Sequence, residues 1–567
     1  MKRILISCLL GGISFAWSAV APASAQTSTP GSLTSALLSY QDVISVDYLK
    51  KHLSAFAADS MEGRDTGTPG QKKAARYLVA EYEKLGLQGV GDNQSYYQKF
   101  ELSADKRDST VFEVYRINGQ KRLVDRSVES RNSSGHFIRS FGGSDTLSGE
   151  IVFAGFGVND SDRGVTHLEG RDLNGKWVMV FQEIPAIAGG DTLIDPSIDA
   201  RERFRTILGQ KQAAGMLVVP LMTEEEFEAT AGRYQLVYDE PGNMSLKYLK
   251  EDSDGAFSGG YNTIKPSLAA EILGVDGGIE GLARLKTSIL NDITGFTPRT
   301  TGYFLTHTPH ITEVTVETEN IAALLEGADD SLKEEVVVLT SHYDHVGIGQ
   351  PDSTGDRIYN GADDDGSGTV ALLNIAKALA QARADGYAPR RSILFLHVTA
   401  EEVGLLGSRY YSDHPIIPME KTVANINIDM IGRIDAKHEK EGITDYAYII
   451  GSEIISSELD SLLKVANANS GQIELDKSYN DLEDPNQFYR RSDHWNFGRF
   501  GVPFIFFFTG VHEDYHRPSD EVDKIRFEKM SEIIRTIYAT TVTVANETDR
   551  PTVDNQEFIE ITKSNPR

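Results

Sequence analysis

Histidine and acidic side chains follow three short apolar runs near the middle of this chain of 567 residues. The runs cover residues 336–339, 393–398 and 423–428. The side chains that follow them are His342, Asp344 and His345 after the first run, Glu401 and Glu402 after the second, and Asp429 after the third. Short β-branched runs that alternate with helical patterns indicate buried parallel strands, and ligands bind beyond the carboxyl ends of such strands. The spacing therefore predicts a metal site at one edge of a sheet.

Two further segments add ligand types to this predicted site. An Asp-Asp-Asp triplet, 363–365, opens a helical pattern that runs to about Ala382, and an aromatic run, 502–508, leads to His516 and Asp520. Two hydrolytic metal ions need one bridging carboxylate, and each ion also needs terminal histidine or carboxylate ligands. Five residues could supply this set: His342, Asp364, Glu402, Asp429 and His516.

Glu401 is left free to act as the general base of such a site. Metal coordination lowers the pKa of water toward neutrality, and a carboxylate within reach can take its proton as the water attacks a carbonyl. Asp344 is placed to fix the tautomer of His342 from behind, and Asp520 could do the same for His516. The residues thus predict metal-assisted hydrolysis.

Composition indicates a globular protein with more than one domain. The length exceeds that of one ordinary core, while 40% hydrophobic and 25% charged residues are ordinary values. The formal net charge of −27 argues against nucleic acid and anionic membranes as partners. Charge kept for solubility accounts for this acidity, so it predicts nothing about the substrate.

The first 25 residues are typical of a signal peptide. Lys2 and Arg3 precede an apolar core, 4–20, and a small-residue cleavage site, 23–25. Export to the periplasm or the extracellular space is expected, and no later apolar run is long enough to span a membrane. The only cysteine, Cys8, lies in an apolar stretch that continues past it, which favours an ordinary signal core over lipoprotein attachment. The mature chain then has no thiol, so histidines and acids must hold any metal.

Together the motifs strongly resemble those of the M28 family of co-catalytic zinc peptidases. In family order they are Ser-His-Tyr-Asp-His at 341–345, Gly-Ala-Asp-Asp-Asp-Gly-Ser-Gly at 361–368, Thr-Ala-Glu-Glu at 399–402, Asn-Ile-Asp-Met at 427–430 and Tyr-His-x-x-x-Asp at 515–520. The resemblance covers most of residues 40–110 and 296–545.

This resemblance implies a role for each matching residue. His342 and Asp429 would bind one zinc ion, Glu402 and His516 the other, Asp364 would bridge the two ions, and Glu401 would be the general base. The family often has a cis peptide bond after the bridging aspartate. Carboxylate and imidazole ligands can also hold manganese or cobalt, so the residues do not single out zinc.

The middle of the chain has a different character. Short strand candidates at 150–153, 176–181 and 216–219 alternate with glycine-rich turns around one helical pattern, 199–214. Residues 149–157 and 173–178 resemble the protease-associated (PA) domain, whose usual role in such enzymes is to position or restrict substrate. We therefore expect a signal peptide, 1–25, a first part of the peptidase domain, 26–125, a PA insert, 126–295, a second part of the peptidase domain, 296–548, and a polar tail, 549–567.

Other hydrolase signatures fail on their context. Residues 512–516 match His-Glu-x-x-His, the zincin motif, which needs both histidines on one helix face. Here the motif follows a strand pattern, and Pro518 turns Arg517 away from helical geometry, so we expect His512 to be a loop histidine. The sequence has no Gly-x-Ser-x-Gly elbow of a serine hydrolase, and thiol catalysis is excluded without a mature cysteine.

Three more histidines lie near these motifs. His397 stands inside an apolar run, so we expect it to be a hydrogen-bonded core residue. His345 and His494 stand close enough in sequence to line the site, although surface positions fit their pattern equally well.

The expected fold is α/β, with a mixed, mostly parallel sheet flanked by helices and interrupted by a smaller β-rich insert. The expected function is that of a secreted or periplasmic di-zinc exopeptidase that acts at the N-terminus of peptides. A carboxypeptidase of the same family stays an alternative, whereas the complete ligand set disfavours a single-zinc glutaminyl cyclase. A non-catalytic binding ectodomain on this fold is the other alternative, although such proteins lose ligands. The preferred substrate residue and the oligomeric state do not follow from these patterns.

Overall fold

The protein, described by a computed structural model, forms two compact units. The structure describes residues 30–118, 121–130, 133–141, 145–188, 191–238, 244–250 and 260–564. The first unit combines the described residues up to Lys99 with those from Glu319 onward, and the second unit is Phe100–Thr318. The boundaries fall inside two long strands, β2 (Tyr97–Asn118) and β15 (Arg299–Leu325). The second unit is therefore wider on both sides than the predicted insert, whose identity as a PA domain stays a prediction.

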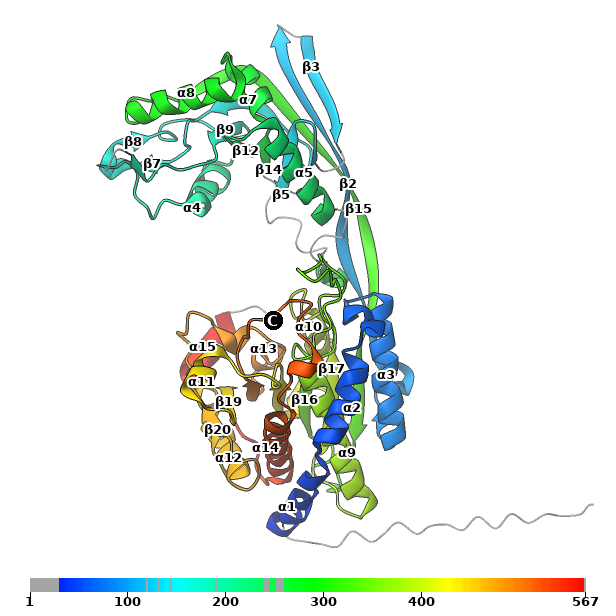
Figure 1. Ribbon diagram of the computed structural model, residues 1–567. Coiled ribbons are helices and arrows are strands. Elements are labelled where there is room, and N and C mark those ends of the chain that lie inside the picture. The colour runs from blue at the N-terminus through cyan, green and yellow to red at the C-terminus, as the bar shows by residue number, and fades with distance from the viewer. Residues whose placement is uncertain are drawn as a thin grey trace, which may run out of the picture. The chain divides into compact units, whose positions relative to one another are not determined.

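A mixed, mostly parallel sheet forms the centre of the first unit (Figure 1). In spatial order its strands are β1 (Gln88–Gly89), β15, β17 (Ser392–Val398), β16 (Val336–His342), β18 (Thr422–Ile428), β21 (Phe504–Phe508), β19 (Tyr446–Gly451) and β20 (Glu474–Asp476). The four strands from β17 to β21 are parallel, while β15 and β19 run antiparallel to their neighbours β17 and β21. The three apolar runs of the sequence are β16, β17 and β18, as predicted.

Both faces of this sheet are covered, because successive side chains of a strand point to opposite sides. On β16, Val337 and Leu339 face one core, whereas Val336 and Val338 face the other. The first core is closed by α2 (Val46–Phe56), α3 (Pro69–Leu85), α9 (Gly366–Ala384), α12 (Ser457–Ala468) and α14 (Phe527–Asn546). The second core is closed by α10 (Leu406–Asp413) and α13 (Trp495–Gly498). Burial on both faces explains the continuous apolar runs and confirms the expected α/β class.

The second unit has a parallel core of its own. Its parallel strands are β6 (Leu147–Phe153), β9 (Trp177–Phe181), β12 (Gly215–Val219) and β14 (Gly260–Ile264), flanked by β5 (Phe137–Phe141) and by β15. Helices α5 (Glu224–Tyr238), α7 (Pro266–Leu273) and α8 (Gly278–Asn291) complete it. The fully buried Trp177 leaves room only for glycine at positions 215 and 260, because a Cβ at Gly215 or Gly260 would lie 2.1 or 2.6 Å from its ring. The three strand candidates of the sequence are confirmed.

The polar tail contains a helix that its composition did not indicate. This helix, α15 (Gln556–Ser564), is anchored by the fully buried Phe558, which packs against Phe504 and Trp495. One aromatic side chain thus docks a segment that is otherwise polar.

The predicted signal peptide, 1–25, lies outside the described residues. Among the described helices, none combines the length and the apolar composition needed to cross a bilayer.

We expect Leu339→Ala to lower the free energy of unfolding of the first unit by about 2–5 kcal/mol, because the substitution leaves a cavity in a closed core. Leu339 is fully buried, whereas Val465 on α12 is 55% exposed. The matched control, Val465→Ala, should change stability by no more than about 0.5 kcal/mol. Denaturant unfolding followed by circular dichroism compares the two variants. Equal transition midpoints would contradict the place of β16 in the core.

Candidate metal centre

The predicted ligands lie where parallel strands of the first unit end. His342 closes β16, and Asp429 directly follows β18. Glu402 stands in the loop after β17, next to the candidate base Glu401, and His516 stands in the loop after β21. Asp364 comes two residues before α9 begins. Because β17, β16, β18 and β21 are parallel neighbours, their carboxyl ends bring these side chains to one edge of the sheet.

Asp364 lies between two histidines. Its Oδ1 is 3.2 Å from His342 Nε2, and its Oδ2 is 3.1 Å from His516 Nε2. Asp429 Oδ1 lies 3.6 Å from His342 Nε2, and Glu402 Oε2 lies 3.0 Å from His516 Nε2. Each oxygen of Asp364 therefore belongs to a different group of three side chains, which is the grouping that two bridged metal ions require.

The donor atoms converge without satisfying one another. Asp364 Oδ2, Asp429 Oδ1 and His516 Nε2 are buried, and among the described residues none of them has a partner in hydrogen-bond geometry. An unsatisfied buried polar group costs about 1–3 kcal/mol, so several around one point are expected where an ion binds. The donors are imidazole nitrogens and carboxylate oxygens, which suit zinc, manganese or cobalt. The residues present therefore fit a bound metal.

Negative charge dominates this edge of the sheet. Burial acts to lower the pKa of His516, yet the carboxylates of Asp364 and Glu402 raise it to about 10. Burial acts to raise the pKa of Asp364, yet the neighbouring His345 and His342 hold it well below its usual value. Such a cluster attracts cations.

Unusual backbone conformations direct the side chains at three points. Ala400, Met430 and His516 adopt left-handed φ values of 57°, 56° and 53°. Left-handed conformations cost about 1–3 kcal/mol in non-glycine residues and concentrate at functional sites. Ala400 directly precedes Glu401, and Met430 directly follows Asp429. The peptide bond between Asp364 and Asp365 is cis, as the family resemblance implies.

Glu401 stands beside the ligands, with its carboxylate within 4.8 Å of donor atoms of His342 and Glu402. Burial raises its pKa well above the ordinary value, which suits a group that must take and then return a proton. The backbone N–H of Glu401 donates to Asp344 Oδ1 at 3.3 Å, and Thr66 Oγ1 donates to Asp344 Oδ2 at 3.0 Å. The Asp344 carboxylate therefore holds the general-base candidate in place.

The contact between Asp344 and His342 differs from the predicted one. His342 Nδ1 lies 3.1 Å from the backbone carbonyl oxygen of Asp344 but 3.8 Å from its carboxylate. The carbonyl fixes the imidazole tautomer, because the carboxylate is already used by Glu401 and Thr66.

Asp520 also differs from its predicted role beside His516. Its carboxylate accepts hydrogen bonds from the backbone N–H groups of Asp363 and Asp364, at 3.0 and 3.2 Å. No hydrogen bond or ion pair joins Asp520 to His516 in the part of the chain that the structure describes. The reason is the turn between them, in which Asp520 N–H donates to Arg517 O at 3.1 Å. This turn aims Asp520 at the aspartate triplet.

Two further residues, His345 and Ser492, contact the candidate ligands. The buried His345 has its Nδ1 2.7 Å from Glu402 Oε1, so of its two expected positions it takes the one in the site. Ser492 Oγ donates to Asp429 Oδ2 at 2.8 Å. His345 follows His342 closely in sequence, which is a usable signal. Residues 490–494, which include Ser492, resemble a loop that lies near the substrate pocket in the M28 family, but that resemblance did not specify a contact with Asp429.

Tyr515, the first residue of the Tyr-His-x-x-x-Asp motif, had no role assigned from the sequence. Its ring stacks on the imidazole of His516, with ring centroids 3.9 Å apart. Burial, assisted by the carboxylates of Asp364 and Glu402, raises the pKa of the Tyr515 hydroxyl, so this group stays protonated. The hydroxyl therefore keeps its proton as a hydrogen-bond donor.

The remaining histidines are structural. His397 Nε2 lies 2.7 Å from the hydroxyl oxygen of Tyr82, which confirms the expected hydrogen-bonded core residue. His494 is fully buried. His512 lies in a turn and not on a helix, so the zincin arrangement is not formed; its Nε2 is 3.3 Å from Asp363 Oδ2.

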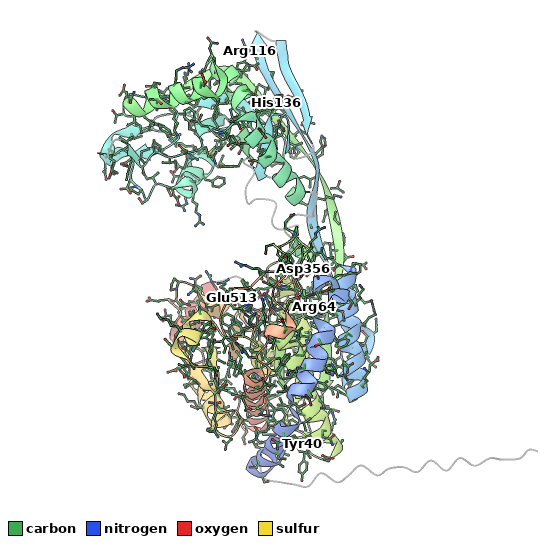
Figure 2. The ribbon with its side chains drawn as sticks, in the orientation of Figure 1. Tyr40, Arg64, Arg116, His136, Asp356 and Glu513 are labelled. Carbon is green, nitrogen blue, oxygen red and sulfur yellow. The ribbon has the colours of Figure 1, made fainter. Side chains whose placement is uncertain are left out.

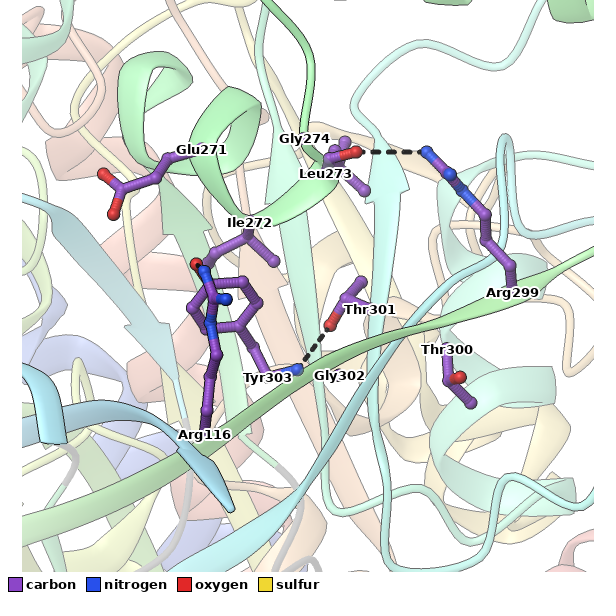
Figure 3. Close-up of a pocket in the computed structure, with 10 residues that line it drawn as sticks. All are labelled: Arg116, Glu271, Ile272, Leu273, Gly274, Arg299, Thr300, Thr301, Gly302 and Tyr303. Carbon is purple, nitrogen blue, oxygen red and sulfur yellow. Dashed lines mark hydrogen bonds between the residues drawn. The ribbon is translucent and has the colours of Figure 1, made fainter. Parts of the chain in front are cut away.

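A cavity of about 320 Å³ lies in the second unit (Figure 3). Its described lining has one acid and no histidine and comprises Arg116, Glu271, Ile272, Leu273, Gly274, Arg299, Thr300, Thr301, Gly302 and Tyr303. It therefore lacks the ligand set found in the first unit.

Comparison with known proteins identifies the segment that carries this site. Residues 320–541 match the model of peptidase family M28. The solved aminopeptidase from Aneurinibacillus sp. strain AM-1 shares the fold: the TM-score is 0.50 at 16% identity, over 91% of this chain and 97% of the other.

Two curated relatives match parts of the chain. It is 35% identical over 200 residues to a probable leucine aminopeptidase 2 from Aspergillus oryzae, covering 34% of each chain. It is 24% identical over 429 residues to a glutamate carboxypeptidase 2 homolog from Caenorhabditis briggsae, covering 69% of this chain and 52% of the relative. The matches thus span about a third to a half of these relatives' lengths.

We expect Ser492→Ala to weaken metal binding by about 10-fold, because loss of a group that orients a ligand typically costs 10–100-fold in affinity. Competition with a chromogenic zinc chelator measures the affinity of the metal-depleted protein. Ser412→Ala is the matched control, since this buried serine donates to the carbonyl of Arg409 at 3.0 Å instead of to a ligand. Equal metal affinities in the two variants would show that Ser492 does not orient a metal ligand.

Proposed function

We propose that this protein is a di-zinc exopeptidase that removes residues from the N-terminus of peptides. The observation that carries the proposal is the Asp364 carboxylate shared between two ligand groups, with Glu401 free beside them. The M28 match of residues 320–541 and the relatives named as aminopeptidases support the same reaction class.

His342 and Asp429 would hold one zinc ion, Glu402 and His516 would hold the other, and Asp364 would contact both. When bound, zinc supplies Lewis acidity, which polarises a carbonyl and lowers the pKa of water. Manganese or cobalt would serve the same donor set.

The protein's own groups would move the proton and orient the reaction. Glu401 accepts the proton of the attacking water and passes it to the leaving amine. Asp344 keeps Glu401 in place by accepting a hydrogen bond from the backbone N–H of Glu401. The substrate is a peptide, and the N-terminal pattern at 1–25 supports export to the periplasm or the extracellular space.

A carboxypeptidase is the second candidate. The alignment with the glutamate carboxypeptidase 2 homolog covers 69% of this chain, more than the alignment with the leucine aminopeptidase. The ligand set serves either reaction, because the two differ only in which end of the peptide the enzyme binds.

Hydrolysis assays separate these candidates. Mature protein supplied with zinc is tested on aminoacyl-coumarin amides, on the same compounds with an acetylated amine, and on N-acetyl dipeptides with a free carboxyl end. We expect cleavage of the free amines alone, abolished by a chelator and restored by zinc. Cleavage of the N-acetyl dipeptides alone would establish the carboxypeptidase. No cleavage of any set would refute catalysis and favour a binding role.

We expect Glu401→Gln to lower turnover by at least about 100-fold while metal content is kept, because the amide fills the same space but cannot accept a proton. Turnover is measured on the best substrate, and bound zinc is measured by elemental analysis. The control is Glu441→Gln, at an exposed acid that ends the short helix α11 (Ala436–Glu441). Full activity of Glu401→Gln would sink the assignment of the base.

A further inference from the structure

One buried guanidinium, that of Arg64, is not used by the proposed chemistry. Arg64 lies on the segment before α3 and is completely inaccessible to solvent (Figure 2). Buried arginines are normally paired with a carboxylate. Arg64 makes no ion pair with any residue that the structure describes, so its burial needs another explanation.

Arg64 donates its hydrogen bonds to backbone carbonyl groups instead. Nε donates to Tyr343 O at 3.0 Å, Nη2 donates to Gly361 O at 2.9 Å, and Nη1 donates to Asn360 O at 2.7 Å and to Phe56 O at 3.2 Å. Three of these four carbonyls belong to the two loops that present metal ligands. One loop begins directly after His342, and the other leads into Asp364.

The backbone around Arg64 is fitted to the same loops. The N–H groups of His345 and Gly347 donate to Arg64 O at 3.3 Å and to Gly63 O at 3.0 Å. A Cβ at Gly63 would lie 2.4 Å from Gly347 O and 2.7 Å from Tyr359 O, so only glycine allows this approach. Gly63 and Arg64 have left-handed φ values of 64° and 55°. Gly63 and Arg64 therefore pack directly against both loops.

The charge of Arg64 also faces the acids of the site. Burial lowers its pKa to about 10, against the opposing effect of Asp364, Asp520 and Asp344, so the guanidinium stays charged at neutral pH. A positive charge held near several carboxylates reduces their mutual repulsion. It does so without occupying a ligand oxygen, because its donors are used by backbone carbonyls.

We propose that Arg64 is a positioning residue of the metal centre: it ties the loop after His342 to the loop before Asp364 and thereby sets the affinity for zinc. This inference rests on the proposed zinc-dependent function, because it presumes that these two ligands bind the ion. Lysine cannot replace Arg64, since a single ammonium lacks the planar fork that reaches carbonyls in several directions.

The test measures the zinc affinity of folded Arg64→Lys and Arg64→Met by chelator competition, with circular dichroism to verify folding. We expect the zinc dissociation constant to rise at least about 10-fold in both variants, which is the range for residues that orient ligands. The matched control is Arg391→Lys. Arg391 is also a buried arginine that donates to backbone carbonyls, of Val544 and Thr548. Unlike Arg64, it also pairs with Glu335, and it stands just before β17, at the end of the strands opposite to the candidate ligands. The Arg391→Lys substitution should lower the melting temperature of the protein and leave its zinc affinity unchanged.

Wild-type zinc affinity in the folded Arg64 variants would overturn the inference. Absence of zinc binding in the wild-type protein would instead overturn the proposed function, so the two failures are distinguishable. Hydrogen exchange of the metal-free wild-type protein adds a test that needs no variant. If the segment of Gly63 and Arg64 already holds the loop after His342 without metal, the amides of His345 and Gly347 should be protected from exchange before zinc is added. Free exchange of both amides until zinc binds would also overturn the inference.

Discussion

The shared carboxylate of Asp364 is the contact around which the first unit is arranged. It brings two histidines from different loops within 3.2 Å of one side chain and places Asp429 and Glu402 beside them. Acids held this close repel one another in a poorly solvated environment, so the arrangement needs cations and a rigid frame. The parallel strands β17, β16, β18 and β21 supply the frame, since their hydrogen-bonded register leaves the strand ends no freedom to separate.

A layer of polar contacts then orients four of the five candidate ligands. Ser492 holds Asp429, His345 holds Glu402, and the Asp344 carbonyl holds His342. The aspartate triplet is held from behind by Asp520, which accepts from its backbone N–H groups. Most of these contacts join segments far apart in sequence. The site is therefore a property of the folded first unit and not of any one motif.

Much of this organisation was predictable from residue types and spacing. The runs at 336–339, 393–398 and 423–428 predicted the strands, because a strand buried on both faces needs an uninterrupted apolar sequence. The acids and histidines behind those runs predicted a site at their common edge. Helix α15 was missed, because a single anchoring aromatic side chain carries little local signal.

The sequence by itself determined the α/β class, the M28-like motifs and the chemical types of the ligands, since these depend on local pattern and on donor chemistry. Only the tertiary structure decided which groups orient the ligands. The Asp344 carboxylate accepts a hydrogen bond from the backbone N–H of Glu401, and the Asp520 carboxylate accepts one from the aspartate triplet. Arg64 donates to backbone carbonyls of two loops. Such partners are chosen by turn geometry and by competition among nearby donors, which exist only once distant segments have come together.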